Sequence, residues 1–315
     1  MTPRTRIQSW YNALASTAVG TLLFIIVLTL AVPERIDQPE SLLLRTSAVL
    51  LGAIAVILIS PRLRRPWRAT IRAAAAIALS SYLFSAVSGL QHMLMDGWND
   101  QALIAFETMF TGEELSHILE RITTPALTEW LMASYVIYIP LMPITAWVVY
   151  RYAGEKQLYA YLFSMIAVNI LCDLGFVLYP IASQLFFDPH QYSIPLTGGF
   201  FTDLAEWVRA NEHYPGGSFP SPHNAVGTVM FVFLWRSHRN WAVAMTPFLL
   251  SIPMATVYGR FHYVSDAIVG IALSVSVLYF VLQTRPATAR RRAAVRRPVR
   301  LIPKLQLARS TGGQS

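Results

Sequence analysis

The segment LTEWLMASYVIYIPLMPITAWVVY, residues 127–150, is an almost uncharged apolar run. A helix needs about 20 such residues to cross about 30 Å of hydrocarbon, so this run is long enough for a membrane span. Seven further apolar stretches are Tyr11–Val32, Leu42–Ser60, Ala69–Leu90, Leu158–Ala182, His223–Trp235, Trp241–Tyr258 and Val264–Leu282. The stretch at 223–235 is short for a full span. The sequence predicts an all-α integral membrane protein with about eight transmembrane helices.

The composition agrees with a membrane location. Of 315 residues, 54% are hydrophobic and only 13% are charged, which is too apolar for an ordinary soluble domain. The first apolar stretch is too long for a cleaved signal sequence, so we expect an uncleaved first span. Cys172 is the only cysteine, which excludes an intrachain disulfide and a cysteine metal cluster.

The net charge of +8 is distributed unevenly along the chain. The connections after the second, fourth and sixth stretches carry Arg62, Arg64, Arg65, Arg68, Arg151, Lys156, Arg236 and Arg239, whereas the other connections carry only Arg35, Arg121, Arg209 and Arg260. The positive-inside rule then places both termini in the cytoplasm. The basic tail, residues 284–315, is expected to attract anionic lipids. It has no aromatic interleaving, so we expect no binding of nucleic acid.

Two long connections lie on the side opposite the basic loops. In the first, Leu103, Phe106 and Phe110 recur at roughly helical spacing among acidic residues, which predicts an outer helix. This helix either lies in the membrane interface or packs on the bundle as a soluble loop helix. The second connection, from Phe186 to Ser221, shows no clear periodicity. Long connections in compact proteins are often functional.

The segment SFPSPHNAVG, residues 218–227, places a histidine at the start of an apolar stretch. Ser221 is a good helix N-cap and Pro222 fits the first helical position, so His223 falls in the first turn. The backbone amides of that turn and the helix dipole favour an anion, and Gly217 just upstream allows a close backbone approach. Taken alone, His223 is more typical of a polar residue that reaches toward water at a membrane interface.

The segment GRFHYVSDAIVG, residues 259–270, opens the last apolar stretch. If the helix begins at or before His262, the spacing of four residues puts His262 and Asp266 on one face. The carboxylate can then hold the imidazole in one tautomer, which makes it a competent nucleophile toward phosphorus. A capping or salt-bridging pair is the alternative. Both histidines fall at the outer ends of their stretches.

Together, FPSPHNA and the later HYVSDAIVG resemble the second and third motifs of the type 2 phosphatidic acid phosphatase superfamily. The most similar branch contains fungal inositol phosphorylceramide synthase, which the outer segment DGWNDQALIAFETMFTG and Leu178–Pro180 also resemble. The resemblance covers roughly residues 70–283. Outside it lie two predicted N-terminal transmembrane helices in residues 1–68 and the basic cytoplasmic tail in residues 284–315. The resemblance implies a six-helix catalytic membrane domain in residues 69–283.

The resemblance also implies roles for individual residues. His262 attacks phosphorus and forms a phosphohistidine, and Asp266 orients it. His223 protonates the leaving group and then activates the acceptor. Ser221, Gly217 and Arg260 are the expected phosphate-binding residues, and neither a metal nor another cofactor is expected.

Two departures from the family pattern concern positive charge. The first motif of the family, a lysine followed seven residues later by Arg-Pro, has no match between Leu178 and Ser221, and Thr256 stands where the third motif usually has arginine. Arg260, His213 and Arg209 are the candidates to replace these charges, with Arg260 preferred because arginine binds phosphate bidentately.

Asp173 and Asn169 lie one turn apart in the apolar stretch 158–182. A carboxylate at membrane depth suggests function, whereas a hydrogen bond between helices would be structural. The sequence leaves both interpretations open.

The leading hypothesis is a membrane enzyme that transfers a phosphoryl or phospho-headgroup of a lipid phosphate, with a polyol such as inositol as a candidate acceptor. The alternative is a lipid phosphate phosphatase acting on phosphatidate or polyprenyl phosphate. A non-catalytic transporter or scaffold is less favoured, since transporters tend to have related halves and polar sites near the midplane. We expect a plasma membrane of bacterial type, with the active site on its extracytoplasmic side.

Overall fold

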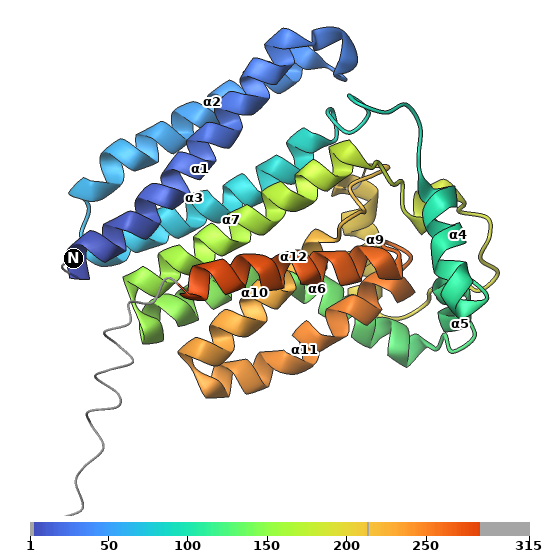
Figure 1. Ribbon diagram of the computed structural model, residues 1–315. Coiled ribbons are helices and arrows are strands. Elements are labelled where there is room, and N and C mark those ends of the chain that lie inside the picture. Colours follow the sequence, from blue (N-terminus) through green and yellow to red (C-terminus); the bar gives the residue numbers. More distant parts are fainter. Residues whose placement is uncertain (1–2, 213, 284–315) are drawn as a thin grey trace, which may run out of the picture. The chain divides into compact units, whose positions relative to one another are not determined.

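The computed structural model describes residues 3–212 and 214–283, and within these ranges every regular element is a helix (Figure 1). Seven of the helices in these ranges are long and apolar enough to cross a membrane. They are α1 (Pro3–Ala31), α2 (Pro39–Ile59), α3 (Arg65–Val87), α6 (Pro125–Val148), α7 (Glu155–Leu178), α11 (Arg239–Tyr258) and α12 (Val264–Gln283). The predicted all-α membrane class is therefore confirmed. The basic tail and His213 lie outside the described residues.

The eighth predicted stretch is α10 (Pro222–Ser237), whose 16 residues give a length of about 24 Å. It is short, as predicted, and packs against α6, α7 and α11. Most helix boundaries agree with the apolar stretches to within four residues. Proline stands at N1 or N2 of α2, α3, α6 and α10, where its fixed φ and missing N–H are tolerated.

Helix α7 connects the N-terminal helix pair to the rest of the bundle, because it contacts α1, α3 and α10. Arg68 of α3 donates to both carboxylate oxygens of Glu155, the first residue of α7, each at 3.0 Å. The buried Arg72 donates to the hydroxyl of Tyr159 at 3.0 Å and lies over the ring of Tyr11 at 3.3 Å. These contacts tie α1, α3 and α7 together at the end that carries the basic connections.

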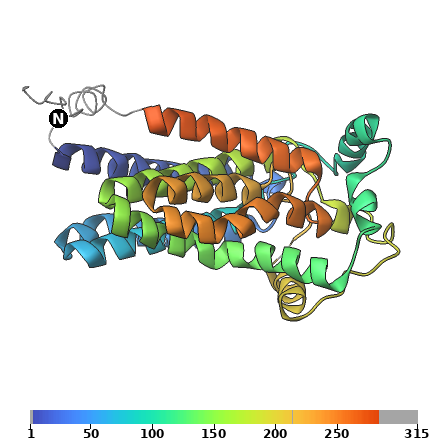
Figure 2. The ribbon, with the colours of Figure 1, turned by 90° about the horizontal axis from the view of Figure 1, so that it is seen from below.

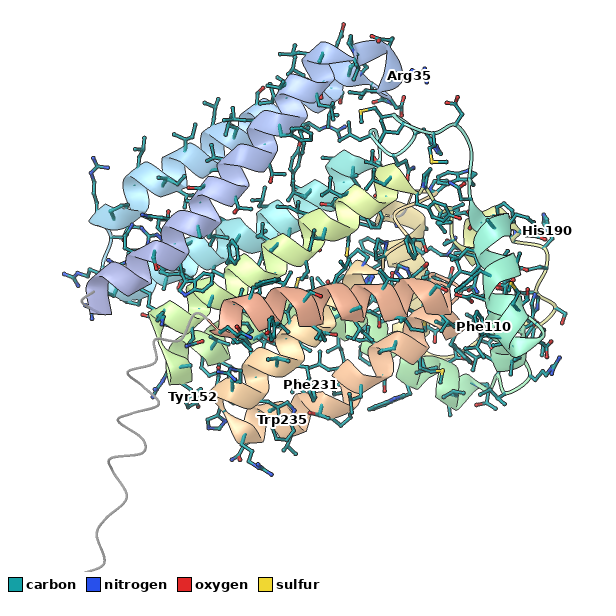
Figure 3. All side chains as sticks on the ribbon, viewed as in Figure 1. Arg35, Phe110, Tyr152, His190, Phe231 and Trp235 are labelled. Carbon is teal, nitrogen blue, oxygen red and sulfur yellow. The ribbon has the colours of Figure 1, made fainter. Side chains whose placement is uncertain are left out.

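Short helices lie mainly at the other end of the bundle (Figure 2). They are α4 (Asp100–Thr111), α5 (Leu115–Glu120), α8 (Gln184–Phe187) and α9 (Phe200–Glu212), while the turns η1 (Pro33–Arg35), η2 (Ser60–Arg62) and the π-helical η3 (Val149–Ala153) extend or connect longer helices. Figure 3 shows Phe110 and His190 at this end and Tyr152 and Trp235 at the opposite one. The second outer connection, in which no helix was predicted, contains α9.

Helix α9 owes its place to a contact across the chain. The carboxylate of Glu129, in the second turn of α6, accepts hydrogen bonds from the N–H groups of Gly199, Phe201 and Thr202 at 2.7 to 3.1 Å. These are the amides that a helix start leaves without a partner in its own helix. A cap supplied by a residue 70 positions earlier is invisible to local periodicity.

Candidate active site

The start of α10 follows the prediction. Ser221 is the N-cap, Pro222 is the first helical residue and His223 lies in the first turn. The Oγ of Ser221 accepts from the backbone N–H of Asn224 at 3.4 Å and from its side-chain amide at 3.0 Å. Because this oxygen already accepts twice, its O–H is the group that can donate to a phosphate oxygen.

The start of α12 differs from the expectation. The helix begins at Val264, not at or before His262, because the N–H groups of Phe261 and His262 both donate to the carbonyl of Thr256, at 3.0 and 3.1 Å. His262 therefore lies in a tight turn before the helix. The two side chains still meet, with Nδ1 of His262 3.3 Å from Oδ2 of Asp266, because Asp266 folds back over the helix start and accepts from the N–H of Tyr263 at 2.9 Å.

Ser218 completes this arrangement, and the sequence reasoning missed it. Its backbone carbonyl lies 2.9 Å from Nδ1 of His262, and its Oγ donates to Oδ2 of Asp266 at 2.5 Å. A carbonyl and a carboxylate only accept hydrogen bonds, so Nδ1 must carry the proton. In the neutral ring, Nε2 then holds the lone pair that can attack phosphorus. His262 and Asp266 are both buried, with exposed fractions of 3% and 0%.

Helices α10 and α12 approach closely enough to bring the two histidines together. The N–H of Ser221 donates to the carbonyl of Asp266 at 3.0 Å, and the hydroxyl of Ser274 donates to the carbonyl of Ala225 at 2.6 Å. A Cβ at Gly270 would lie 2.5 Å from the carbonyl oxygen of Ser221. Glycine at this position is therefore required for the observed spacing of the two helices.

His223 is positioned by aromatic rings of α6. Its ring stacks on Tyr135, with centroids 4.6 Å apart and an interplanar angle of 24°, and it packs on Tyr138 at 4.7 Å. The ring centroids of His223 and His262 are 5.8 Å apart. The two imidazoles are therefore near neighbours, as a phosphoryl group that engages both rings requires.

The other expected phosphate ligands have contacts of their own. Gly217 has a φ of +65°, which favours glycine, and a Cβ there would meet Tyr214 and Phe84 at 2.9 and 3.0 Å. The guanidinium of Arg260 donates to the carbonyl of Ile194 at 2.6 Å and lies 3.8 Å from the Tyr192 ring centroid. It also approaches Glu120 at 3.7 Å. Burial lowers the pKa of Arg260.

Thr256, which stands where the family has arginine, and the candidate replacement Arg209 both bond to other groups of the protein. Thr256 is buried, and its Oγ1 accepts from the side-chain amide of Asn224 at 3.1 Å. Arg209 pairs with Glu206 at 2.6 Å on α9. The backbone N–H of Ala225 donates to the carbonyl of Ser221 at 3.0 Å. Of the amides expected to cradle a phosphate, those of Ser221, Asn224 and Ala225 are thus used within the protein.

Two buried acids of α4 support the His262 turn, and neither was predicted as functional. Asp100 is fully buried and accepts from the N–H groups of Ala182 and Ser183, at 2.8 and 3.1 Å, and from the hydroxyl of Tyr263 at 2.9 Å. Burial raises the pKa of Asp100, opposed by these hydrogen bonds. Asp100 therefore fixes the residue that follows His262.

Glu107, two turns further along α4, caps the start of α12. Its carboxylate accepts from the N–H of Ser265 at 2.6 Å. Burial raises the pKa of Glu107, opposed by hydrogen bonds from Ser265, and the charge of Asp266 raises it further. The shared helix face of Asp100, Leu103 and Glu107 was the sequence signal that could have revealed them.

The opposite face of α4 remains apolar and exposed. Phe106, Met109 and Phe110 have exposed fractions of 52%, 78% and 75%, whereas Leu103 is buried against Ile181 and Tyr263. The predicted outer helix is thus present. It packs on the protein through one face and presents the other as an interfacial helix would.

The second outer connection divides its polar and aromatic side chains between two environments. Asp203, Glu206 and Trp207 are exposed on α9, whereas Tyr214 donates to the carbonyl of Phe84 at 2.9 Å. In the described part of the chain, no group of three or more His, Cys, Asp or Glu side chains is placed to hold a metal ion.

Fold and site together define a helical membrane protein with a histidine pair at the ends of two adjacent helices. The model of the PAP2 superfamily matches residues 101–280, which is more than half of the chain. The chain therefore belongs to the PAP2 superfamily, as the paired histidine motifs predicted. This match begins after α3 and ends within α12.

Comparison with curated proteins gives a distant relative. The chain is 24% identical over 204 residues to inositol phosphorylceramide synthase of Candida albicans. This similarity covers 57% of the present chain and 41% of the relative, so the chain spans less than half of that protein's length. No solved structure matches the chain significantly. The family match and this relative support an enzyme that acts on a lipid phosphate.

Proposed function

We propose that this protein is a membrane-embedded lipid phosphotransferase that works through a phosphohistidine at His262. The observation that carries the proposal is the fixed Nδ1–H of His262, held by the Ser218 carbonyl and Asp266, with the ring of His223 5.8 Å away. Nε2 of His262 forms a bond to phosphorus while the bond from phosphorus to the leaving oxygen breaks. His223 gives that oxygen its proton.

In the second half-reaction, His223 takes the proton of an acceptor hydroxyl. The acceptor oxygen bonds to phosphorus as the bond to Nε2 of His262 breaks, which restores the enzyme. An alcohol acceptor needs a bound position, because water would otherwise react first owing to its high concentration. The outer side chains Asp203, Glu206, Trp207 and Tyr214 are the candidates for binding a polyol such as inositol. If water is the acceptor, the same residues make the protein a lipid phosphate phosphatase.

Product analysis distinguishes the two acceptors. Purified protein receives a phosphate-labelled lipid with and without inositol, and the labelled products are separated. We expect a new phosphorylated alcohol or phosphodiester that forms with wild-type protein and not with His223→Ala. If free phosphate is the sole product and no polyol reduces its amount, the protein is a lipid phosphate phosphatase. Absence of an acid-labile label on His262 during turnover would rule out the intermediate itself.

The charge asymmetry of the connections further supports cytoplasmic termini and an extracytoplasmic site. Single cysteines in a Cys172→Ser background test this orientation. Arg62→Cys and His190→Cys are suitable because both positions are exposed, whereas Gly217 is buried with a positive φ. A membrane-impermeant thiol reagent added outside the cells should label position 190 alone. Labelling of both positions from one side would refute the orientation.

A further inference from the structure

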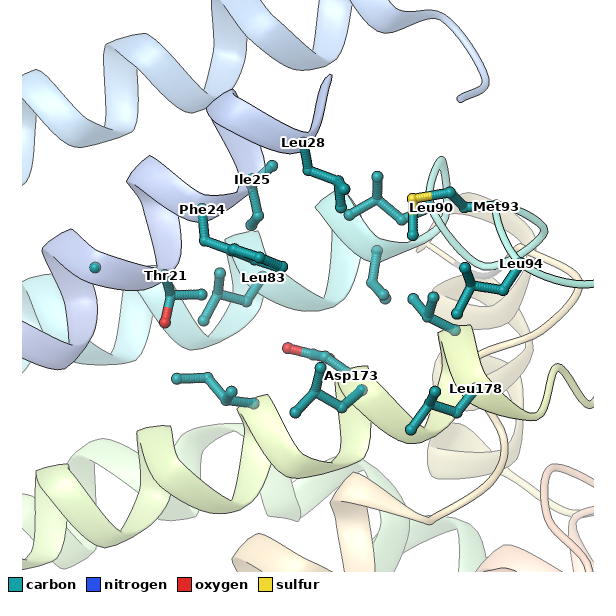
Figure 4. A pocket seen from close by; sticks show the side chains of 15 residues that line it. Thr21, Phe24, Ile25, Leu28, Leu83, Leu90, Met93, Leu94, Asp173 and Leu178 are labelled. Carbon is teal, nitrogen blue, oxygen red and sulfur yellow. The ribbon is translucent and has the colours of Figure 1, made fainter. Parts of the chain in front are cut away.

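Asn169 and Asp173, one turn apart on α7, have different surroundings. The side-chain amide of Asn169 donates to the hydroxyl of Ser80 on α3 and to the carbonyl of Met165 at 3.0 Å. Asn169 thus provides the hydrogen bond between helices. Asp173 takes no part in it and has no hydrogen bond or ion pair to a residue of the described ranges. Its side chain lines a cavity instead (Figure 4).

This cavity has a volume of about 450 Å³ and lies among α1, α3 and α7. Its walls are apolar and include Phe24, Ile25, Leu83, Leu90 and Leu174. Figure 4 shows the carboxyl group of Asp173 on the α7 side and the hydroxyl of Thr21 on the α1 side. The lining residues of α1 run from Gly20 to Leu28, a rise of about 12 Å along the helix. The shape suits an extended hydrocarbon chain.

The depth of Asp173 indicates which part of a lipid would meet it. The residue lies five positions before the end of α7 at Leu178, which is about 7.5 Å along the axis. Leu94 and Leu178 line the cavity at that same end. A carboxyl group at this depth lies near the boundary where the polar part of a lipid meets its chains. The cost of burying it is offset when a ligand donates a hydrogen bond.

We propose that this cavity binds one chain of a membrane lipid whose hydroxyl or amide group donates a hydrogen bond to Asp173. The apolar walls hold the chain, and Asp173 selects for the donor. The site is separate from the histidine pair and does not depend on turnover. Its test can therefore fail while the proposed phosphotransfer stands.

Two photoreactive probes test the site in the purified full-length protein. One is octadecanol carrying a diazirine in its chain, and the other is the matching octadecyl methyl ether, which lacks the donor. We expect the alcohol to label peptides of α1 and α7 about two- to tenfold more than the ether, the range that one net hydrogen bond provides. Asp173→Leu should remove this preference without abolishing labelling, whereas Asp173→Asn, which retains an acceptor oxygen, should keep part of it.

A filling substitution tests the location. Gly20 lines the cavity, and a Cβ built there meets nothing within 4 Å, so we expect the ring of Gly20→Phe to occupy the cavity and block both probes. Gly52→Phe, at an equally open position on α2, is the matched control and should leave labelling unchanged. Equal labelling by the two probes in wild-type protein would overturn the hydrogen bond to Asp173. Labelling that survives Gly20→Phe would overturn the site.

Discussion

His262 and His223 lie on neighbouring segments, yet the protein holds them by different means. The Nδ1–H of His262 donates to the Ser218 carbonyl at 2.9 Å and lies 3.3 Å from Oδ2 of Asp266, and these contacts fix the ring. His223 is positioned through its ring faces, by Tyr135 and Tyr138 of α6. A nucleophile must keep one tautomer through both half-reactions, whereas a proton donor and acceptor must change its protonation state in each. Stacking fixes the plane of a ring in either protonation state.

Removal of the nucleophile should have the largest effect on turnover. His262→Ala should lower turnover of a lipid phosphate at least about 1,000-fold, because no bond to phosphorus can form. The rate of product release from labelled lipid measures this. His190→Ala, at an exposed histidine of the outer connection, is the control and should retain wild-type activity. Wild-type turnover by a folded His262→Ala protein would disprove the assigned role.

Loss of the groups that orient His262 should have a smaller effect. We expect Asp266→Asn to lower turnover about 100-fold, because a carboxylate that orients the reactive imidazole is less indispensable than the nucleophile itself. Ser218→Ala should lower it about tenfold, since the carbonyl of residue 218 still holds Nδ1 while the hydroxyl no longer holds Asp266. Initial rates at saturating lipid give these ratios. A larger loss for Ser218→Ala than for Asp266→Asn would contradict the expectation that Asp266 contributes more than the Ser218 hydroxyl to orienting His262.

The His223 side of the comparison depends on ring stacking. Tyr135→Leu should lower turnover about three- to tenfold, because an aromatic pair contributes about 0.5–1.5 kcal/mol beyond its buried area. Tyr135→Phe keeps the ring and should keep most of the activity. The label on His262 should still form in Tyr135→Leu, since Nδ1 of His262 is held by Ser218 and Asp266 rather than by Tyr135. Equal losses in the two variants would assign the effect to the hydroxyl rather than to stacking.

The buried acids of α4 support the turn that carries His262, and we expect them to affect how the free energy of unfolding depends on pH. The raised pKa of Glu107 means that the folded state binds its proton more tightly than the unfolded chain. The free energy of unfolding should then decrease as the pH rises from the ordinary carboxyl range through the raised pKa. Glu107→Gln keeps an oxygen for the Ser265 N–H and should flatten this slope.

Thermal unfolding in detergent at several pH values measures the slope. Glu40→Gln, at an exposed position of α2, should retain the slope of the wild-type protein. An unchanged slope in Glu107→Gln would assign the pH dependence to other groups, with Asp100→Asn the next variant to compare.

Much of the fold could be predicted from the sequence. Membrane helices are encoded by the apolarity of about 20 consecutive residues. The starts of α6 and α10 are encoded by the capping side chains of Thr124 and Ser221 and by the prolines that follow them. The family was predicted from two motifs and is confirmed by the match over residues 101–280. The catalytic and phosphate-binding roles stay predictions. The helix α9 was missed although Phe201, Leu204, Ala205 and Val208 recur at helical spacing within it. Only its N-terminal cap, from Glu129 on another helix, could not be predicted.

The sequence by itself therefore determined the class of protein, the membrane helices and the candidate histidines, since each depends on residues close together in the chain. Only the tertiary structure decided what holds those histidines. Ser218 meets His262 across 44 positions, and Asp100 meets Tyr263 across 163. A hydrogen bond depends on the distance between two atoms in space, and that distance is set by how α4, α10 and α12 pack. Asp173 also acquires its apolar cavity only because α1 and α3 pack beside α7.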